Sequence, residues 1–280
     1  MPNLYLTYYK NQNNLNSQGR SALGDIIHVP KEEILGHYPH DKGSKIRVGI
    51  WPETIHPEEG CQPGETFDAE VYSTNESYGG ISVLLNKRIE IAAVQPLDIV
   101  LGLSRPQILK RILELLQGFL VRNIFLVCAD RSEKSFLNSK ILNLVSIEKH
   151  LKEGSRQAGI SYCPGVIIVD KFYNFPQYFK MFPFNMGLIA DHEARDNLPN
   201  LLRKKMKDKD LNPTLSRDSS FKGPFLGKSV LLSIGPERGW TRSEKEAFKN
   251  WGFLPFSISS GILRVDVALS AATAQIRALF

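Results

Sequence analysis

Two short segments near the C-terminus hold the residues best suited to chemistry. The first is Gly235-Pro-Glu-Arg-Gly239, and the second runs from Ser257 through Arg264 to Asp266. Glycine lets a ligand approach the backbone closely and proline makes a loop rigid, so the first segment is typical of a binding loop. Arg264 offers a planar fork of N–H donors suited to a phosphate or a carbonyl, but it cannot act as a base. Glu237 and Asp266 are the candidate acids for orienting a substrate or removing a proton.

A helix start signal places the first segment in a loop. Thr241 is followed three residues later by Glu244, which is the spacing of a capping box. This spacing predicts a helix over Arg242–Trp251, which the next glycine ends. Gly235–Gly239 is then a strand-to-helix loop, and in open α/β sheets such loops lie at the carboxyl ends of strands, where ligands bind. The alternative role for Glu237 is a carboxylate that stabilises the amino end of the following helix.

From Pro96 onward, apolar runs typical of strands alternate with helical patterns. The first helical pattern places six apolar residues on one face, namely Ile108, Leu109, Ile112, Leu115, Leu116 and Phe119. The predicted strands cover residues 97–103, 124–128, 165–169, 186–190, 230–234 and 253–258. A last helix is predicted from about Asp266 to Phe280, with an apolar face that packs on the core or on a partner. Alternation of this kind predicts an α/β fold with a parallel sheet.

Residues 1–92 follow a different pattern. Short β-type runs are separated there by Gly, Pro, Asn and acidic clusters, and they cover residues 45–51, 66–72 and 81–85. Such spacing predicts a small β-barrel or sandwich. The sequence therefore divides into residues 1–92 and residues 93–280. Between Asp191 and Lys228, a polar stretch containing the basic run 203–210 is predicted to leave the core, either as a solvated segment or as a nucleic-acid contact.

Composition narrows the class of protein. The chain has 280 residues, of which 42% are hydrophobic and 23% charged, as in a folded soluble protein. No apolar run approaches the roughly 18 residues of a membrane span, and the polar start lacks a secretory signal, so we expect a cytoplasmic protein without membrane partners. The net charge of +6 is compatible with binding a polyanion. Cys61, Cys128 and Cys163 are odd in number and far apart, which fits a reducing compartment.

Other motifs are weak. Gly223–Ser229 has three residues between its glycines where a Walker A loop has four, and it precedes a strand instead of following one. No G-x-G-x-x-G fingerprint occurs. His37, His40, His56 and Cys61 lack the spacing of a zinc site, so we expect no metal. Cys128 lies in an apolar stretch, where burial raises a thiol pKa and disfavours nucleophilic chemistry.

The C-terminal segments carry a family resemblance. Leu231-Leu-Ser-Ile-Gly-Pro-Glu-Arg-Gly-Trp240 and Phe256-Ser-Ile-Ser-Ser-Gly-Ile-Leu-Arg-Val-Asp-Val-Ala268 resemble, in order and spacing, two signature segments of the RsmE family of RNA methyltransferases. The resemblance covers residues 96–280 most closely. It implies a SPOUT-type α/β domain with a C-terminal trefoil knot, preceded by a small PUA-like β-barrel domain. It also implies S-adenosylmethionine as the cofactor, a homodimer, and methylation of N3 of a uridine in 16S ribosomal RNA of the small subunit.

The same resemblance implies roles for individual residues. Arg264, Glu237 and Asp266 are the expected catalytic residues, with Arg264 positioning the substrate. The expected cofactor-binding residues lie in three segments, namely Leu188, Ile189 and Ala190, then Ile234, Gly235, Pro236, Glu237 and Gly239, and finally Ser257, Ile258, Ile262 and Leu263.

This sequence also departs from the family pattern. Arg238 stands at the second glycine of G-P-E-G-G, Val265-Asp-Val267 stands where the family has T-E-T, and Ile160 replaces an arginine. These changes leave two alternatives open. One is an RNA-binding paralogue without catalysis, and the other is the same fold acting on a different RNA, such as transfer RNA.

Overall fold

The computed structural model describes residues 4–7, 23–30, 41–51, 62–75, 80–90, 95–207 and 229–278. The chain forms two compact units. Unit 1 comprises Met1–Val94, Leu113–Leu120 and Leu144–Gly165, and unit 2 comprises Gln95–Ile112, Val121–Asn143 and Val166–Phe280. The division into domains of residues 1–92 and 93–280 stays a prediction.

Unit 1 contains a five-stranded sheet in the order β1-β3-β5-β6-β2. β1 pairs in parallel with β3, and the other neighbours are antiparallel. Alternating side chains of β3, β5 and β6 are buried, which explains the short β-type runs in the sequence. The elements are β1 (Leu4–Thr7), β2 (Ile26–Pro30), β3 (Lys45–Ile50), β4 (Gln62–Pro63), β5 (Glu65–Asn75), β6 (Gly80–Arg88), α2 (Leu144–Ala158) and β9 (Tyr162–Cys163), with β4 pairing β9.

A lysine of α2 has an unusual environment. Lys152 Nζ lies 3.1 Å from Glu148 Oε1 and 5.9 Å from the ring centroid of Trp51. Burial, followed by the positive charge of Arg156, lowers the pKa of Lys152 from 10.5 to about 8. Because the unfolded chain keeps this proton up to higher pH than the folded chain does, the protonated lysine costs stability below pH 8. That cost disappears as the pH rises from 8 towards 10.5.

Lys152→Met should remove this pH dependence. Relative to the variant, the native protein should gain about 1 kcal/mol in the free energy of unfolding between pH 7.5 and pH 10, after allowance for partial solvent screening. Urea denaturation at a series of pH values measures the difference. A difference that stays constant over this range would contradict the expected titration.

Unit 2 is built on a six-stranded sheet in the order β10-β8-β7-β12-β11-β13. The five strands from β8 to β13 in this order are mutually parallel, as predicted for an α/β fold. Each strand coincides with a predicted apolar run to within a few residues, because strands covered on both faces must be apolar throughout. The strands are β7 (Gln95–Gly102), β8 (Val121–Val127), β10 (Gly165–Val169), β11 (Met186–Ala190), β12 (Val230–Ile234) and β13 (Phe253–Phe256).

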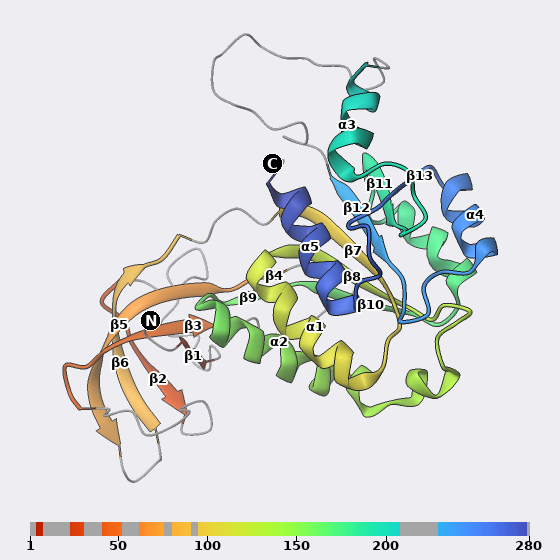
Figure 1. The fold of residues 1–280 in the computed structure, drawn as a ribbon. Coiled ribbons are helices and arrows are strands. Elements are labelled where there is room, and N and C mark those ends of the chain that lie inside the picture. Colours follow the sequence, from red (N-terminus) through yellow and green to blue (C-terminus); the bar gives the residue numbers. More distant parts are fainter. Residues whose placement is uncertain are drawn as a thin grey trace. The chain divides into compact units, whose positions relative to one another are not determined.

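The strand order differs from the chain order in the middle of this sheet. β12 follows β11 in the chain, yet it lies between β7 and β11 (Figure 1). The helices of unit 2 include α4, which packs on β13, and α5, which packs on β12. Their bounds are α1 (Pro106–Phe119, shared with unit 1), α3 (Leu198–Lys207), α4 (Arg242–Asn250) and α5 (Val265–Arg277), and short 3₁₀ turns cover Lys134–Asn138, Lys140–Leu142 and Phe172–Phe179.

An aromatic cluster holds α4 in place. Phe248 of α4 packs against Phe172, Trp240 and Phe253, with ring centroids 5.2, 5.0 and 4.8 Å away. All four side chains are buried, and their tilted or edge-to-face packing adds to the free energy gained by burial. The loop before α4 is therefore attached to a rigid base.

The thiol of Cys128 and the apolar face of the first helix can be compared with the sequence predictions. Cys128 lies just after β8, and its pKa is raised by burial, as the sequence analysis expects. In α1, the apolar face is confirmed at Leu109, Ile112 and Leu116, which are fully buried.

Several features of the sequence lie outside the described residues, namely His37, His40, His56, Cys61, most of the 223–229 segment and residues 208–210 of the basic run. None of the helices in the described ranges has the length and apolar character that crossing a membrane requires.

Candidate functional site

A pocket of about 830 Å³ opens at the carboxyl ends of three adjacent parallel strands. Ala190 ends β11 and Ile234 ends β12, and the segment that follows β13 supplies the opposite wall. Val265 and Ala268 of α5 complete the lining. This is the edge at which open α/β sheets bind their ligands, and the volume is that of a small-molecule site.

The Gly235–Gly239 loop lines this pocket and has a fixed conformation. Gly239 N donates to Pro236 O at 2.7 Å, and Gly239 has a φ of +68°, which favours glycine. At the end of β7, a Cβ on Gly102 would overlap the ring of Pro236. The sequence analysis did not identify Gly102, although a glycine that ends a buried strand next to a predicted binding edge is a usable signal.

Glu237 has a structural partner. Its Oε1 accepts the backbone N–H of Arg105 at 2.9 Å, immediately before the first residue of α1. A carboxylate there satisfies a backbone donor and stabilises the positive end of the helix dipole. The helix that Glu237 serves is thus α1, and not the following helix α4 that the sequence analysis considered.

The predicted capping box at the start of α4 is confirmed. Thr241 Oγ1 accepts from Glu244 N at 3.2 Å, and Glu244 Oε2 accepts from Thr241 N at 2.7 Å. Glu244 is fully buried, and its Oε1 also accepts from Asp130 N at 2.8 Å. The helix ends at Asn250, one residue before the predicted end. The capping box therefore fixes the first turn of α4, and the second oxygen of Glu244 holds that turn to the loop after β8.

Thr241→Ala should reduce the free energy of unfolding by about 1 kcal/mol, because it removes one cap acceptor and one donor to a buried carboxylate. Ser243→Ala is the matched control, since Ser243 Oγ lies on an exposed surface and its one hydrogen bond within the described residues is to Thr241 Oγ1, at 3.0 Å. Chemical denaturation compares the two variants. Equal losses in both would show that the cap contributes nothing of its own.

Arg264 reaches the pocket from the N-cap position of α5. Its side chain is 64% exposed, and Nη2 donates to Asp266 Oδ2 at 2.7 Å. Asp266 does not line the pocket, and its Oδ1 is buried without a hydrogen-bond partner in the described part of the chain. The two predicted residues therefore act as a pair, with the cation at the pocket and the carboxylate behind it.

The structure brings most of the predicted site residues together. Those that line the pocket are Ala190, Ile234, Gly235, Pro236, Glu237, Gly239, Ile258, Ile262, Leu263 and Arg264. Leu188 and Ile189 are instead buried within β11. Ser257 lies next to the lining, where its backbone N donates to Asp196 O at 2.8 Å.

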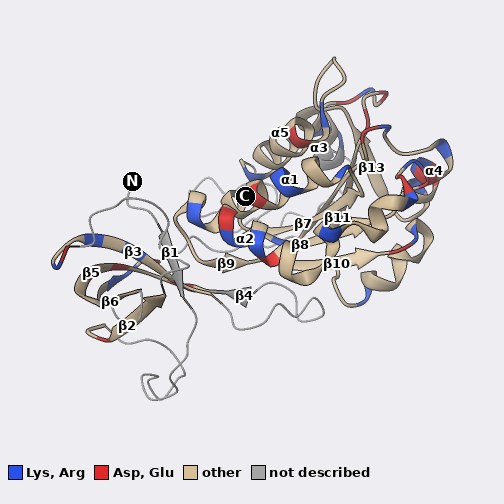
Figure 2. Cartoon of the chain, turned by 90° about the horizontal axis from the view of Figure 1, so that it is seen from below, with Lys and Arg blue, Asp and Glu red and all other residues tan. Residues whose placement is uncertain are grey.

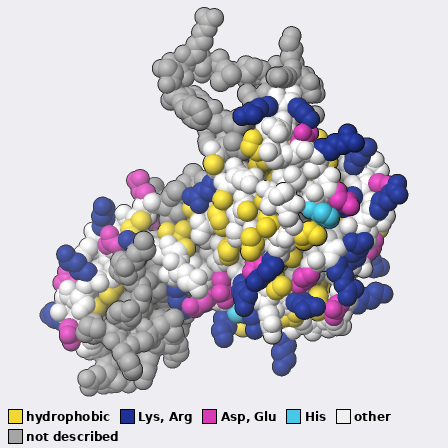
Figure 3. Space-filling view, viewed as in Figure 1, with side chains coloured by type: hydrophobic (Ala, Val, Ile, Leu, Met, Phe, Trp, Pro, Cys, Tyr) yellow, Lys and Arg dark blue, Asp and Glu magenta, His cyan; other side chains and the backbone are white. Residues whose placement is uncertain are grey.

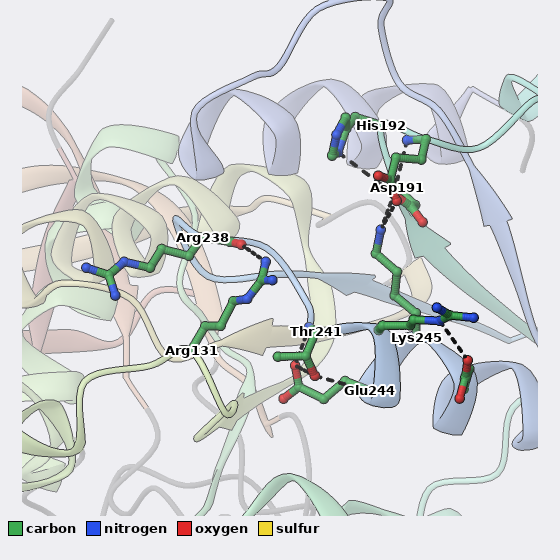
Figure 4. A network of polar contacts seen from close by, with 10 residues as sticks. Arg131, Asp191, His192, Arg238, Thr241, Glu244 and Lys245 are labelled. Atoms are coloured by element: carbon green, nitrogen blue, oxygen red, sulfur yellow. Dashed lines mark hydrogen bonds and ion pairs between the residues drawn. The ribbon is translucent and has the colours of Figure 1, made fainter.

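An ionic network on the pocket wall escaped the sequence analysis. Lys245 of α4 donates to Asp191 Oδ1 at 2.8 Å and to Glu193 Oε2 at 2.7 Å, just beyond the end of β11 (Figure 4). Burial alone would lower the pKa of Lys245, but its bonds to both carboxylates raise that pKa above its ordinary value. The bond to Lys245 lowers the pKa of Glu193. The signal was Asp191-His-Glu193, a polar group directly after a buried strand.

Two further residues bear on the pocket. Arg131, in the turn after β8, donates from Nη1 to Arg238 O at 2.6 Å. Trp240 lines the pocket, and its indole N–H is buried without a hydrogen-bond partner among the described residues. The loop thus presents a fixed backbone and an unused donor to the same region.

Comparison with known proteins reveals relatives. A family model for the RNA methyltransferase domain matches residues 92–277. The chain is 28% identical over 180 residues to ribosomal RNA small subunit methyltransferase E 1 of Borreliella burgdorferi, covering 64% of this chain and 66% of the relative. It is 27% identical over 198 residues to ribosomal RNA small subunit methyltransferase E of Treponema pallidum, covering 71% of this chain and 68% of the relative.

Solved structures share the fold. A ribosomal RNA small subunit methyltransferase E from Neisseria gonorrhoeae, bound to S-adenosylmethionine, has a TM-score of 0.65 and 15% identity, covering 100% of this chain and 98% of the other. A methyltransferase from Legionella pneumophila, also with this cofactor bound, has a TM-score of 0.63 and 16% identity, covering 98% and 97%. At these identities the likeness establishes the fold alone.

Proposed function

Because the chain belongs to the RNA methyltransferase family, we propose that it transfers a methyl group from S-adenosylmethionine to N3 of a uridine in 16S ribosomal RNA. The observation that carries this proposal is the pocket. Residues 234–239, which follow β12, and residues 258–264, which follow β13, meet there at the carboxyl ends of the strands on either side of β11. The relatives named as small-subunit methyltransferases support the choice of RNA.

The pocket residues fit the proposed cofactor. Backbone groups of the Gly235–Gly239 loop are open to close approach, since glycine leaves them uncovered. Ile234, Ile258 and Leu263 supply apolar contacts for an adenine ring, and Trp240 offers the unused indole donor. The remaining predicted cofactor-binding residues, Leu188, Ile189 and Ser257, are proposed to support the pocket walls from behind.

The proposed chemistry is a direct displacement. When bound, the cofactor supplies a methyl group made electrophilic by its sulfonium. As the bond from uridine N3 to the methyl carbon forms, the carbon–sulfur bond breaks and the N3 proton must leave. Arg264 donates to the uracil oxygen on which negative charge develops, and the paired Asp266 orients the guanidinium. Asp266 lies behind Arg264 and does not line the pocket, so its proposed role is to orient the guanidinium, and the N3 proton passes to water in the pocket.

Glu237 has a different part in this proposal. Its carboxylate already accepts the Arg105 N–H, so protonation of Glu237 would weaken a hydrogen bond that holds the Gly235–Gly239 loop, called the cofactor loop below. We therefore assign Glu237 to holding the loop.

Basic residues and the N-terminal region are proposed to bind the RNA. Lys and Arg lie on α2, among other elements (Figure 2). Cations hold phosphates in register while the target base is extracted into the pocket. The proposal assigns residues 1–92 to a PUA-like barrel domain and residues 93–280 to a SPOUT domain. The position of β12 between β7 and β11 supports a trefoil knot in the second of these.

A homodimer is part of the proposal. Apolar side chains gather on the face that carries α5 (Figure 3), where Val267 is 46% exposed. Ile262, just before α5, is 82% exposed. Covering such side chains is favourable, and an isologous contact would cover both copies at once. Val267→Glu should lower the sedimentation coefficient to that of a single chain. With ribosomal RNA as its substrate, the protein is proposed to work in the cytoplasm.

Calorimetric titration with S-adenosylmethionine tests the proposal first. We expect a Kd in the micromolar range, which is about −8 kcal/mol. Ala268→Trp places a large ring in the pocket and should abolish binding. Asn250→Trp adds the same ring at an exposed position at the end of α4, outside the pocket lining, and serves as the control. Absence of binding to the native protein would favour an RNA-binding paralogue without catalysis.

The RNA is identified by its modified nucleosides. Purified enzyme and cofactor are incubated with 16S ribosomal RNA, with small subunits and with transfer RNA, and each product is digested to nucleosides. 3-Methyluridine in the 16S sample supports the proposal. Its formation in transfer RNA alone would show that the substrate is different.

A further inference from the structure

We propose that Arg238, positioned by Arg131, binds a backbone phosphate of the substrate RNA beside the target uridine. The inference rests on the proposed function, and it assigns a role to a residue at which this chain departs from the family pattern. Arg238 lies on the pocket wall and is exposed.

Most of the positive charges on the pocket wall are balanced by acids. Lys245 is neutralised by Asp191 and Glu193. Arg264 pairs with Asp266 at 2.7 Å, and Arg242 pairs with Glu246 at 3.2 Å. Among the cations of this wall, only Arg131 and Arg238 form no ion pair with an acid within the described residues. Arg131 is engaged with the backbone of Arg238, so the Arg238 guanidinium is the cation of this wall that is left for an anion.

The backbone of Arg238 is fixed by hydrogen bonds, whereas its guanidinium forms none within the described residues. Arg131 Nη1 donates to Arg238 O at 2.6 Å. The hydrogen bond from Gly239 N to Pro236 O closes the turn that contains Arg238. The bond from Arg105 N to the side chain of Glu237 holds the residue before it. No hydrogen bond to the Arg238 guanidinium is found in the described portion of the chain. A free cation on a rigid loop loses little conformational freedom when it binds, because its attachment point is already ordered.

The surroundings of the Arg238 guanidinium indicate which anion it binds. Glu237, the adjacent acid, is held towards the Arg105 N–H and forms no ion pair with Arg238 within the described residues. In Figure 4 the Arg238 side chain extends away from Lys245 and Asp191. An exposed arginine directed away from that wall suits a ligand that arrives from solvent and carries many phosphates. The planar guanidinium fork matches two phosphate oxygens at once.

The test measures RNA binding and methyl transfer as separate quantities. Binding of full-length transcribed 16S ribosomal RNA is titrated at several salt concentrations for the native protein, Arg238→Gln and Arg238→Gly. Lys249→Gln is the matched control, because it removes one exposed charge from the last turn of α4. We expect both Arg238 variants to bind RNA 5- to 10-fold more weakly. The slope of log affinity against log salt should fall by about 1 in each, and the control should change neither quantity.

Two further readouts define the role of each arginine. In methylation assays, Arg238→Gln should raise KM for RNA with kcat within about 2-fold, and the Kd for S-adenosylmethionine should stay the same. Arg131→Gln should weaken RNA binding in the native background, but add little in the Arg238→Gln background, because it acts through Arg238.

Each contrary outcome is distinct. Unchanged RNA affinity and salt slope in the Arg238 variants would overturn the inference. Weaker cofactor binding with unchanged RNA affinity would assign the guanidinium to the carboxylate of the cofactor, which also overturns it. If the native protein methylates no RNA, the proposed function fails, whereas the binding titrations still decide whether Arg238 contacts phosphate.

Discussion

Arg264→Ala should lower the rate of methyl transfer by about 100- to 1000-fold, with the Kd for S-adenosylmethionine changed less than about 3-fold. The side chain is exposed at the pocket and belongs to a charged pair with Asp266, so its removal deletes the donors that we propose stabilise the developing charge on the substrate. It also leaves Asp266 without its cation. The proposed cofactor contacts come mainly from backbone and apolar groups, which the substitution leaves in place.

Single-turnover methylation and calorimetry measure the two quantities. Arg111→Ala, which removes an exposed arginine from α1 outside the pocket lining, is the control. Asp266→Asn keeps the shape of the pair and removes its charge, so it should slow transfer by a smaller factor. Native turnover by Arg264→Ala would remove this residue from the site.

Gly102→Ala should weaken cofactor binding by at least 10-fold, or about 1.4 kcal/mol, and reduce stability by about 1–3 kcal/mol. The added methyl group would overlap the Pro236 ring, and it would lie 3.1 Å from the backbone carbon of Gly235. The cofactor loop must then move away from β7. Because that loop is fixed by backbone contacts, the movement displaces every group it presents to the pocket.

Gly118→Ala is the matched control for this change. Gly118 lies in α1, and a Cβ there meets nothing within 4 Å. Alanine in a helix is favoured over glycine by about 0.5–1 kcal/mol, so the control should be as stable as the native protein or more stable. Calorimetric titration and thermal unfolding of both variants give the comparison. Native cofactor affinity in Gly102→Ala would show that the loop tolerates displacement.

Local signals in the sequence predicted much of the α/β part. The strands at 165–169, 186–190 and 230–234 match β10, β11 and β12, because continuous apolar runs are typical of strands buried on both faces. Thr241 and Glu244 predicted the start of α4 because a capping box depends only on residues three positions apart. Such features need no knowledge of the rest of the chain.

Features that depend on distant partners were not predictable in this way. Glu237 was assigned either to chemistry or to its own following helix, whereas it bonds to the backbone N of Arg105, just before α1 and 132 positions away in the sequence. The bond from Arg131 to Arg238 and the pairing of Lys245 with Asp191 likewise join segments brought together only by the strand order. Periodicity and composition contain no information about that order, so these contacts could be found only in three dimensions.

The late arrival of β12 has a consequence for the order of assembly. β7 and β11 are both synthesised before β12, yet they do not pair with each other in the finished sheet. The pairing at the centre of the sheet therefore needs residues 230–234, and such non-local pairing slows folding. α5, which supplies part of the pocket lining, then packs on β12. A nascent chain therefore lacks a complete pocket until residues up to Ala268 have been synthesised and folded, which makes the proposed methyl-transfer site one of the last parts of the protein to form.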